Sequence, residues 1–263
     1  MKLFHNRIDI KEIIELVLNT EDIIFDESAV SAVKEKGAAD YVTKVDTGVQ
    51  DYMQKELADR YPEIGFIGEE SGLFAADRAG CYWILDPIDG TTNLIHHYQM
   101  SAVSLGLYES GRMSFGIVYN PFSKEMFVAV AGQGAYLNGR PIHVSEIGEM
   151  KDSLVSYGSS PYLKDHAREM FAMYERIFLR CADFRRCGSA ALDLCYIACG
   201  RQDAYLEENL KPWDYAAGAL ILQEAGGRID CWKAEETIPY LANADILASN
   251  GNIHEDVRAC IYG

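Results

Sequence analysis

Two consecutive hairpin signals constrain the fold more than any other feature of this sequence. Each consists of two mainly apolar segments that flank or precede a turn containing glycine. The paired segments are residues 102–108 with 114–119, around a turn at 109–112, and residues 125–130 with 134–137, before a turn at 138–139. Consecutive hairpins predict an antiparallel sheet, unlike the parallel sheet of a doubly wound nucleotide-binding fold. The sequence also contains neither a G-x-G-x-x-G fingerprint nor a P-loop.

The remaining segments predict a mixed α+β chain built in layers. The expected helices are residues 9–18, 46–57, 168–179, 190–198, 213–225 and 254–261, and the expected strands are residues 64–67, 82–85, 154–157, 204–206 and 246–249. Residues 34–39 are predicted to be a loop with Gly37 as the breaker, and Glu207 is expected to lie in a loop after its strand. A polar stretch at 144–152 predicts two domains, residues 1–147 and residues 148–263.

A motif that combines two carboxylates with a helix start occupies residues 86–93, DPIDGTTN. The apolar run before it predicts a buried strand that stops at Pro87, because proline cannot donate to a sheet ladder. Gly90 marks a turn, and the TTN that follows consists of residue types that cap helix N-termini. Asp86 and Asp89 repel each other here unless a cation lies between them, and the free N–H groups of a helix start suit a phosphate. The motif alone is more often a solvated turn, but the geometry suggests a divalent metal and a phosphate in one place.

Further acidic residues strengthen the metal hypothesis. Glu69 and Glu70 follow the strand at 64–67, and Asp214 opens an apolar helix. Acidic residues at the ends of three apolar elements are what an oxygen-ligand cage for a hard cation requires. No acid of the set has an obvious cationic partner in the sequence, so gathering them in one cleft would be strongly unfavourable without cations. The set is Asp46, Glu69, Asp86, Asp89 and Asp214, of which Asp46 is also expected to cap a helix.

Taken together, these segments resemble the inositol monophosphatase family over nearly the whole chain. The resemblance rests on DYVTKVD at 40–46, GEES at 68–71, DPIDGTTN at 86–93 and WDYAAG at 213–218. This combination is specific, whereas each piece alone would be weak. It implies the layered α-β-α-β-α sandwich of inositol monophosphatases and fructose-1,6-bisphosphatases, within the Mg²⁺-dependent, Li⁺-sensitive phosphatase superfamily. One departure is Gln99, where the family often carries proline, which leaves the shape of that loop open.

The resemblance also implies a role for each acid. A first Mg²⁺ would be held by Glu69, Asp86 and the backbone carbonyl of Ile88. A second would be held by Asp86, Asp89 and Asp214, and a third, weaker ion is expected near Glu69. Thr91 resembles the family threonine that hydrogen-bonds the attacking water, with Asp46 behind it, and Glu69 would accept the proton of that water. Implied substrate contacts are the N–H groups of Gly90 and Thr91 for the phosphate, and Ser189, Ala190 and Glu207 for the sugar pocket.

The implied activity is hydrolysis of myo-inositol monophosphate to inositol and phosphate by a metal-activated water. LKPWD at 210–214 looks more like a bacterial-type inositol monophosphatase than like relatives that hydrolyse fructose 1,6-bisphosphate, NADP or adenosine 3′,5′-bisphosphate. Those substrates remain alternatives, as do a weakly catalytic regulatory or interaction protein with this fold and a Ca²⁺-binding structural domain. The chain lacks the EF-hand loop that would favour the last. Because family members are often homodimers, a homodimer is expected.

Composition limits the partners and the location. The formal charge of −16 argues against non-specific nucleic-acid binding, which requires cationic side chains on phosphates. No stretch approaches a membrane span, and the N-terminus lacks a signal-peptide core, so the protein is expected in the cytoplasm without membrane attachment. The seven cysteines, Cys195 and Cys199 among them, are expected to be thiols rather than a metal site. His96 and His97 are expected to pack or lie on the surface, and Lys36 to be solvated unless it helps to hold the phosphate.

Overall fold

The computed structural model describes residues 6–26, 34–37, 40–72, 76–159, 164–233 and 238–262, within which the strands form sheets of seven, five and two strands. The large sheet has the order β3-β4-β5-β6-β7-β8-β9, and its neighbours are antiparallel except for β3 with β4. Its strands are β3 (Gly65–Gly68), β4 (Cys81–Asp89), β5 (Ala102–Glu109), β6 (Arg112–Asn120), β7 (Glu125–Val130), β8 (Ala135–Leu137) and β9 (Arg140–Ile142). The hairpin signals are therefore confirmed as β5-β6 and β7-β8.

The second sheet has the order β11-β10-β12-β14-β13 and mixes parallel with antiparallel pairs. Its strands are β10 (Leu154–Tyr157), β11 (Asp183–Arg185), β12 (Ala204–Leu210), β13 (Arg228–Cys231) and β14 (Ala244–Ser249). The large sheet thus ends at Ile142 and the second begins at Leu154, on either side of the polar stretch at 144–152. The division into two domains nevertheless stays a prediction, because α8 from the second half packs against β5 and β6 of the first.

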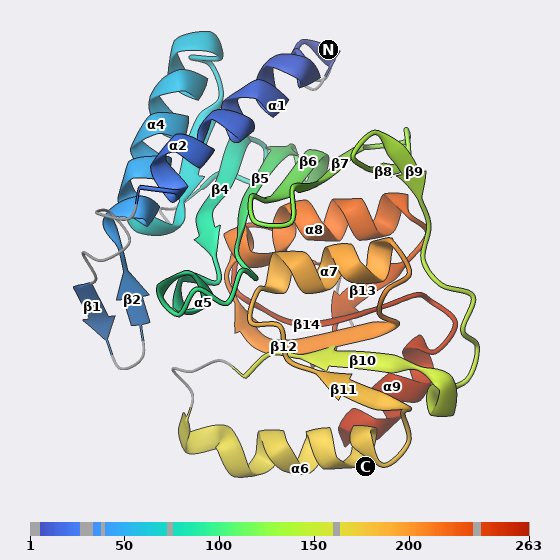
Figure 1. The fold of residues 1–263 in the computed structure, drawn as a ribbon. Helices are drawn as coiled ribbons and strands as arrows, with labels where there is room; N and C mark the ends of the chain where they lie inside the picture. Colours follow the sequence, from blue (N-terminus) through green and yellow to red (C-terminus); the bar gives the residue numbers. More distant parts are fainter. Residues whose placement is uncertain are drawn as a thin grey trace.

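Helices cover both sheets and complete five layers (Figure 1). In order across the molecule the layers are α1 (Ile10–Asn19), α2 (Glu21–Ile24) and α4 (Lys44–Arg60); the large sheet; α7 (Ala190–Ala198) and α8 (Pro212–Glu224); the second sheet; and α6 (Ala167–Phe178) with α9 (His254–Tyr262). Short elements are α5 (Thr91–Ile95) and the 3₁₀ turns η2 (Glu69–Ser71), η3 (Met150–Asp152) and η4 (Lys164–His166). The predicted α-β-α-β-α sandwich is confirmed. None of the helices in the described ranges is long and apolar enough to cross a membrane.

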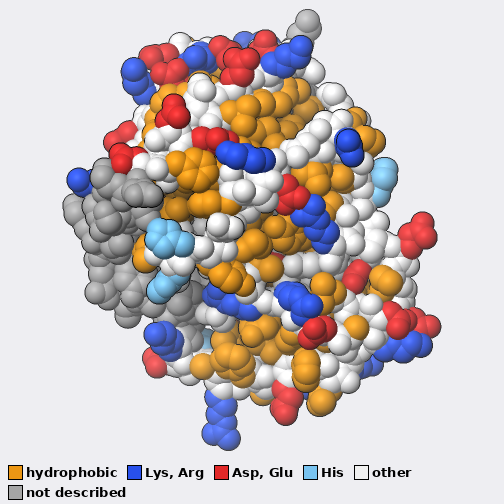
Figure 2. Space-filling model, in the orientation of Figure 1, with side chains coloured by type: hydrophobic (Ala, Val, Ile, Leu, Met, Phe, Trp, Pro, Cys, Tyr) orange, Lys and Arg blue, Asp and Glu red, His pale blue; other side chains and the backbone are white. Residues whose placement is uncertain are grey.

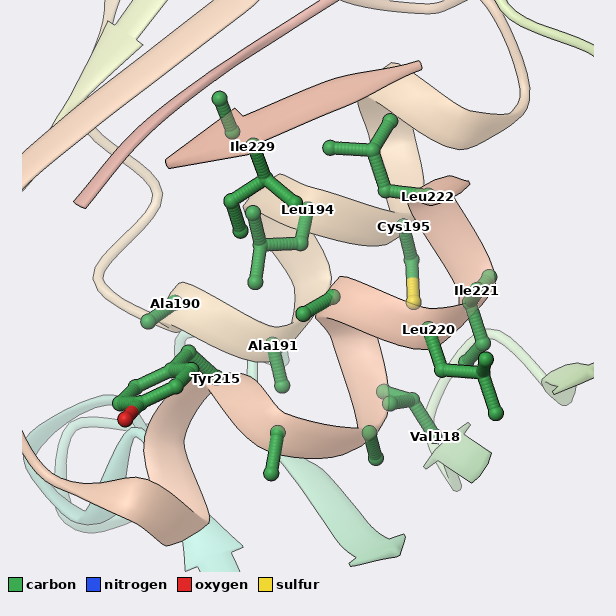
Figure 3. Close-up of a cluster of buried hydrophobic side chains, with 14 of the residues drawn as sticks. Val118, Ala190, Ala191, Leu194, Cys195, Tyr215, Leu220, Ile221, Leu222 and Ile229 are labelled. Atoms are coloured by element: carbon green, nitrogen blue, oxygen red, sulfur yellow. The ribbon is translucent and has the colours of Figure 1, made fainter. Parts of the chain in front are cut away.

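Three groups of buried side chains fill the spaces between these layers. The central group lies around α7 and α8, between the two sheets, and Figure 3 shows part of it. Small residues let α8 approach its neighbours closely. A Cβ atom on Gly116 of β6 would lie 2.8 Å from the carbonyl oxygen of Ala217, and a Cβ on Gly218 would lie 2.9 Å from Leu194 of α7. The AAGA run of α8 therefore fixes the distance between this helix, α7 and the large sheet.

Three local expectations were wrong. Strand β4 does not stop at Pro87 but continues to Asp89, because its pairing with β5 is irregular between Asp86 and Asp89 and no regular ladder bond is lost at the proline. Of the loop predicted at 34–39, residues 34–37 form β1 (Lys34–Gly37), which pairs with β2 (Asp40–Val42) through backbone bonds that need no apolar alternation. Residues 38 and 39 lie outside the described residues. Glu207 lies within β12 rather than in a loop after it.

The face drawn in Figure 2 carries an apolar groove of about 830 Å³ between α1 and the strands β6 to β8. Its lining includes Ile10, Ile14 and Leu18, one helical stripe of α1, which faces Val128 and Tyr136 of neighbouring strands. The groove is separate from the acidic residues singled out above, none of which lines it.

Candidate active site

Asp46 and Thr91 join the start of α4 to the start of α5. Asp46 is only 1% exposed and lies in the first turn of α4, where its Oδ2 accepts hydrogen bonds from the backbone N–H (2.8 Å) and the hydroxyl (2.5 Å) of Thr43. Its other oxygen, Oδ1, accepts from the Thr91 hydroxyl at 2.8 Å. The Thr91 oxygen also lies 3.1 Å from the carbonyl oxygen of Ile88. Asp46 thus belongs to a capping box, and the same carboxylate orients Thr91.

Asp86 lies near the end of β4, and Glu69 directly follows β3, the strand that runs parallel to β4. Asp86 is 3% exposed, and its Oδ1 accepts from the N–H of Ile88 at 2.9 Å. Glu69 opens the turn η2, which the buried side chain of Gln50 holds by accepting from the N–H of Glu70 (3.0 Å) and donating to Ser71 (2.9 Å). Gln50 projects from α4, so the helix that carries Asp46 also supports the turn that carries Glu69.

Asp89 lies against the N-terminus of α7. Its Oδ2 accepts from the hydroxyl of Ser189 at 2.5 Å and from the N–H of Ala191 at 2.7 Å. Ser189 is the N-cap of α7, so this carboxylate takes N–H groups that the helix leaves unpaired. Burial raises the pKa of Asp89 to about 6, although these hydrogen bonds and the positive charge of Arg186 act in the opposite direction.

Asp214 lies in the first turn of α8, in the position that Asp46 has in α4. Its Oδ2 accepts from the N–H of Lys211, the residue before the helix, at 2.7 Å. The hydroxyl of Ser104 holds this end of α8 by donating to the carbonyl of Trp213 at 3.2 Å. Ser104 pairs across the sheet with Asp86, so one hydrogen bond fixes the start of α8 beside the strand that carries Asp86.

The charges of the predicted acids act on one another. The pKa of Asp86 is raised well above its ordinary value, first by burial and then by neighbouring negative charges. These charges belong to Glu69, Asp89, Asp214 and Asp46. The pKa of Asp214 is raised in the same way, by burial and then by the carboxylates of Asp89, Glu69 and Glu207. The structure therefore brings the other four predicted acids within electrostatic reach of Asp86.

These residues fit a hard divalent cation in donor type and in charge. Carboxylate and carbonyl oxygens are the ligands that Mg²⁺ accepts, and a bound cation would relieve the repulsion that raises the pKa values. The side chains do not stand at ligand spacing, since no group of three or more acidic, histidine or cysteine residues in the described ranges is arranged to hold a metal ion. The ligand set of Glu69, Asp86, Ile88, Asp89 and Asp214 stays a prediction.

The residues predicted to contact substrate lie around the same acids. Gly90 adopts φ of +91° as the N-cap of α5, and a Cβ there would lie 2.8 Å from the carbonyl oxygen of Met100, so the turn requires glycine. Ser189 and Ala190 are buried at the start of α7, with Ser189 donating to Asp89. Glu207 on β12 is near enough to raise the pKa of Asp214. All four lie beside the acidic cluster, and their contacts with a substrate stay a prediction.

The described side chains of the other sequence candidates do not join the cluster. His96 and His97 are exposed after α5, and Lys36 has its side chain outside the described residues. Cys195 is buried within α7, and Cys199 follows the helix with its thiol against the Tyr196 carbonyl at 3.6 Å. Gln99 has φ of +63°, which proline cannot adopt because its ring fixes φ near −65°. The departure from proline at this position therefore changes the backbone of the loop.

Sequence reasoning missed the residues that hold the acids in place. Besides Gln50 and Ser104, the set includes Asn93, which was expected to be a helix-capping residue. Its amide instead donates to the carbonyls of Met100 (2.6 Å) and Cys187 (2.9 Å), which ties α5 to the segment before α7. Arg186 is exposed, yet its charge lowers the pKa of Asp89. Only spacing within DPIDGTTN hinted at Asn93; the others gave no sequence signal.

Comparison with known proteins places this arrangement in context. The model of the Inositol monophosphatase family matches residues 8–262. The Nus factor SuhB of Escherichia coli strain K12 is 37% identical over 219 residues, covering 83% of this chain and 81% of that protein. The extragenic suppressor protein suhB from Bartonella henselae superposes with a TM-score of 0.86 at 33% identity, covering 95% of this chain and 96% of that chain. Inositol monophosphate-bound SaIMPase-II, from Staphylococcus aureus, superposes with a TM-score of 0.77 at 25% identity, covering 93% and 88%.

Proposed function

Because this chain belongs to the inositol monophosphatase family, we propose that it is a Mg²⁺-dependent phosphomonoesterase that hydrolyses myo-inositol monophosphate to inositol and phosphate. The observation that carries the proposal is the hydrogen bond from Thr91 to the buried Asp46, beside four further acids whose charges act on one another. The similarity to SaIMPase-II, a protein solved with bound inositol monophosphate, supports the choice of substrate. Fructose 1,6-bisphosphate, NADP and adenosine 3′,5′-bisphosphate are the alternatives within the same chemistry.

Mg²⁺ is the proposed cofactor. Glu69, Asp86 and the Ile88 carbonyl would hold one ion, and Asp86, Asp89 and Asp214 a second, with a weaker third near Glu69. When bound, the metal lowers the pKa of water and offsets negative charge on the phosphate and the leaving alkoxide. The hydrogen bonds from Ile88 to Asp86 and from Ser189 to Asp89 fix the orientation of two of these carboxylates.

Thr91 and Asp46 orient the attacking water. Asp46 accepts hydrogen bonds at both of its oxygens, so it acts as an acceptor and not as a proton donor. The Thr91 hydroxyl donates its one hydrogen bond to Asp46, or shares it between Asp46 and the Ile88 carbonyl. The lone pairs of the hydroxyl oxygen can then accept a hydrogen bond from water. Glu69 then takes a proton from that water as the water oxygen attacks phosphorus. The bond between phosphorus and the ester oxygen breaks, and solvent protonates the alkoxide that leaves.

The two ends of the substrate are assigned to different elements. The N–H groups of Gly90 and Thr91, at the turn that glycine permits, would bind phosphate oxygens. Ser189, Ala190 and Glu207 would line the side of the leaving alcohol, where Glu207 accepts a hydroxyl hydrogen bond. Since Ser189 donates to Asp89, its contribution to this side is to hold that carboxylate.

Phosphate release from a substrate panel tests the proposal. Inositol 1-phosphate, glycerol 2-phosphate, fructose 1,6-bisphosphate, NADP and adenosine 3′,5′-bisphosphate are each assayed with and without Mg²⁺, and with Li⁺, which is expected to inhibit. The proposal requires Mg²⁺-dependent turnover with the highest kcat/KM on inositol 1-phosphate. A higher kcat/KM on another member would keep the reaction and replace the substrate, and Ca²⁺ supporting turnover in place of Mg²⁺ would contradict the cofactor.

A pair of variants separates the site from the rest of the acidic surface. Asp89→Asn removes one charge from the cluster and should lower kcat by ~10²-fold or more, as is typical for a preorganised charge-stabilising group. Asp59→Asn makes the same change at an exposed position on α4 and should leave turnover unaffected. Full activity in purified, folded Asp89→Asn would refute the assigned chemistry.

A regulatory role is a second candidate function, favoured by one specific finding: the relative at 37% identity is named a Nus factor. Such a role could accompany hydrolysis or replace it. The test is whether this chain substitutes for SuhB in E. coli cells that lack it, and whether Asp89→Asn does so equally. If wild type and Asp89→Asn both substitute for SuhB, the regulatory role is separate from hydrolysis. If neither does, the regulatory role has no support.

We also propose that the protein is a homodimer located in the cytoplasm. Its proposed binding partner is the small phosphorylated substrate. All seven cysteines lie in the described residues and each is a free thiol, as a reducing compartment allows. Sedimentation velocity of the purified protein tests the dimer, because the monomer mass is 29.4 kDa. A single species at that mass would contradict it.

A further inference from the structure

The carboxylate of Glu207 is held by a neighbour on its own strand. Tyr205 and Glu207 are two residues apart on β12, so their side chains share one face of the sheet. The Tyr205 hydroxyl donates to Oε2 of Glu207, and Tyr205 is completely buried. Burial, followed by the charge of Glu207, raises the pKa of Tyr205 well above its ordinary value, which keeps the phenol protonated and therefore a donor. One oxygen of Glu207 is consequently held by a buried donor on the same strand.

Gly158, which directly follows β10, supplies the space for the same carboxylate. A Cβ atom at this position would lie 1.8 Å from Oε2 and 2.5 Å from Oε1 of Glu207. The backbone of Gly158 is not in the left-handed region, so space and not conformation is the reason for glycine here. Its position is fixed by a bond from its N–H to the Leu206 carbonyl (2.9 Å) and by the Tyr174 hydroxyl, which donates to its carbonyl.

We propose that Tyr205 and Gly158 are positioning residues that hold Glu207 as a fixed hydrogen-bond acceptor for a hydroxyl group of the leaving alcohol. This inference rests on the proposed function and extends it to the class of leaving group. An acceptor selects a group that donates, so neutral alcohols with several hydroxyls fit beside it. A second phosphate placed there would be repelled by the negative charges of both Glu207 and Asp214. The charge of Glu207 already raises the pKa of Asp214.

The test compares two substrates and three variants. Inositol 1-phosphate carries hydroxyls for Glu207, whereas phenyl phosphate carries none. Tyr205→Phe removes the donor, Gly158→Ala places a methyl group where the carboxylate lies, and Tyr108→Phe is the matched control. Tyr108 is also buried, at 2% exposure, but its hydroxyl donates to the backbone carbonyl of Arg78.

We expect Tyr205→Phe and Gly158→Ala each to lower kcat/KM for inositol 1-phosphate by about tenfold, mainly through KM, because a hydrogen bond to a charged group is weakened. Turnover of phenyl phosphate should stay within about twofold of wild type, and Tyr108→Phe should behave as wild type on both substrates. In a Glu207→Ala background, neither substitution should cause further loss on inositol 1-phosphate, because the group through which they act is gone.

Equal losses on both substrates would overturn the proposal in favour of a purely structural role for the two residues. Further losses in the Glu207→Ala background would overturn it as well, since the effect would not pass through Glu207. If wild type hydrolyses neither substrate, the proposed function has failed, and calorimetric binding of inositol 1-phosphate decides the positioning claim. About tenfold weaker binding by Tyr205→Phe than by wild type then supports it, and unchanged or absent binding refutes it.

Discussion

Gly116 and Gly106 offer a sharp test of how the central helix α8 is positioned. They face each other across β5 and β6, and both lie under Ala217. A Cβ on Gly116 would lie 2.8 Å from the Ala217 carbonyl oxygen and 3.2 Å from its Cα, so backbone would have to move. A Cβ on Gly106 would lie 2.4 Å from the terminal methyl of Met113, which can rotate away, and 3.5 Å from the Ala217 nitrogen. The same substitution therefore meets a rigid obstacle at one position and a flexible one at the other.

The magnitude follows from two opposing effects. Overpacking a core costs about 1–3 kcal/mol, whereas replacing glycine by alanine stabilises by about 0.4–1 kcal/mol through the unfolded chain. Gly116→Ala should therefore lose about 1–2 kcal/mol, which is a fall of about 2–8 °C in melting temperature. Gly106→Ala should stay within about 0.5 kcal/mol of wild type, because only a flexible side chain must move.

Thermal unfolding followed by circular dichroism measures both variants under one condition. Adding Ala217→Gly to Gly116→Ala should restore nothing, because the obstacle is the backbone of residue 217 and not its methyl group. Since α8 carries Asp214 in its first turn, Gly116→Ala should also lower kcat while Gly106→Ala should not. A Gly116→Ala protein as stable as Gly106→Ala would refute the close contact between α8 and the large sheet.

Four further predictions follow from single side chains. Thr91→Val should lower kcat by ~10²-fold, measured by phosphate release, and should also lower the melting temperature, because Oδ1 of the buried Asp46 loses the Thr91 donor. Gln99→Pro should lower the melting temperature, because φ of +63° is closed to proline, whereas Gln99→Gly should not. Burial lowers the pKa of His254 below its ordinary value of 6.5, so the unfolded chain takes up its proton first. Stability should therefore fall below about pH 6.5, by at most about 1.4 kcal/mol per pH unit, and a pH series of melting temperatures should show a smaller fall in His254→Gln. Asp86→Asn should raise the melting temperature in the absence of Mg²⁺, by relieving repulsion, and should reduce the further rise on adding Mg²⁺; a lower melting temperature in metal-free buffer would contradict the repulsion.

Much of the fold could be predicted because its determinants are local. The turns between β5 and β6 and between β8 and β9 are examples: Ser110 and Gly111, like Asn138 and Gly139, take positive φ at both central positions, as these dipeptides favour. The path of β4 through Pro87 could not be predicted, because it depends on an irregular register with β5 and not on the residues of β4 alone. The hairpin of β1 and β2 could not be predicted either, because apolar and polar residues do not alternate in its sequence.

The acids of the candidate site could be named from the sequence because motifs and family resemblance mark them, but their supports could not. Gln50 acts across 20 residues of chain on the N–H of Glu70, and Ser104 acts across 109 residues on the Trp213 carbonyl. Neither sits in a motif, and each becomes meaningful only when helix and strand are packed together. Long-range contacts of single polar side chains are the part of a site that local patterns do not encode.

The three-dimensional arrangement explains how so many carboxylates are kept in one place. Asp46 lies in the first turn of α4 and Asp214 in the first turn of α8, and each accepts from the backbone N–H at its helix start. Asp89 accepts from the N–H groups at the start of α7. Helix starts offer unpaired N–H groups and a positive dipole end, so each carboxylate stabilises a helix while that helix partly offsets its repulsion by the others.

This double role bears on how substitutions in the cluster should be interpreted. An asparagine at any of the three positions keeps an oxygen that can cap the helix, and it removes only the charge. An alanine removes both, and would lower stability by about 1 kcal/mol at the helix start in addition to its effect on chemistry. A loss of turnover in the asparagine variants, without a loss of stability, therefore reports on the charge that the proposed metal ions require. The same loss in an alanine variant mixes the two causes and cannot separate the site from the fold that holds it.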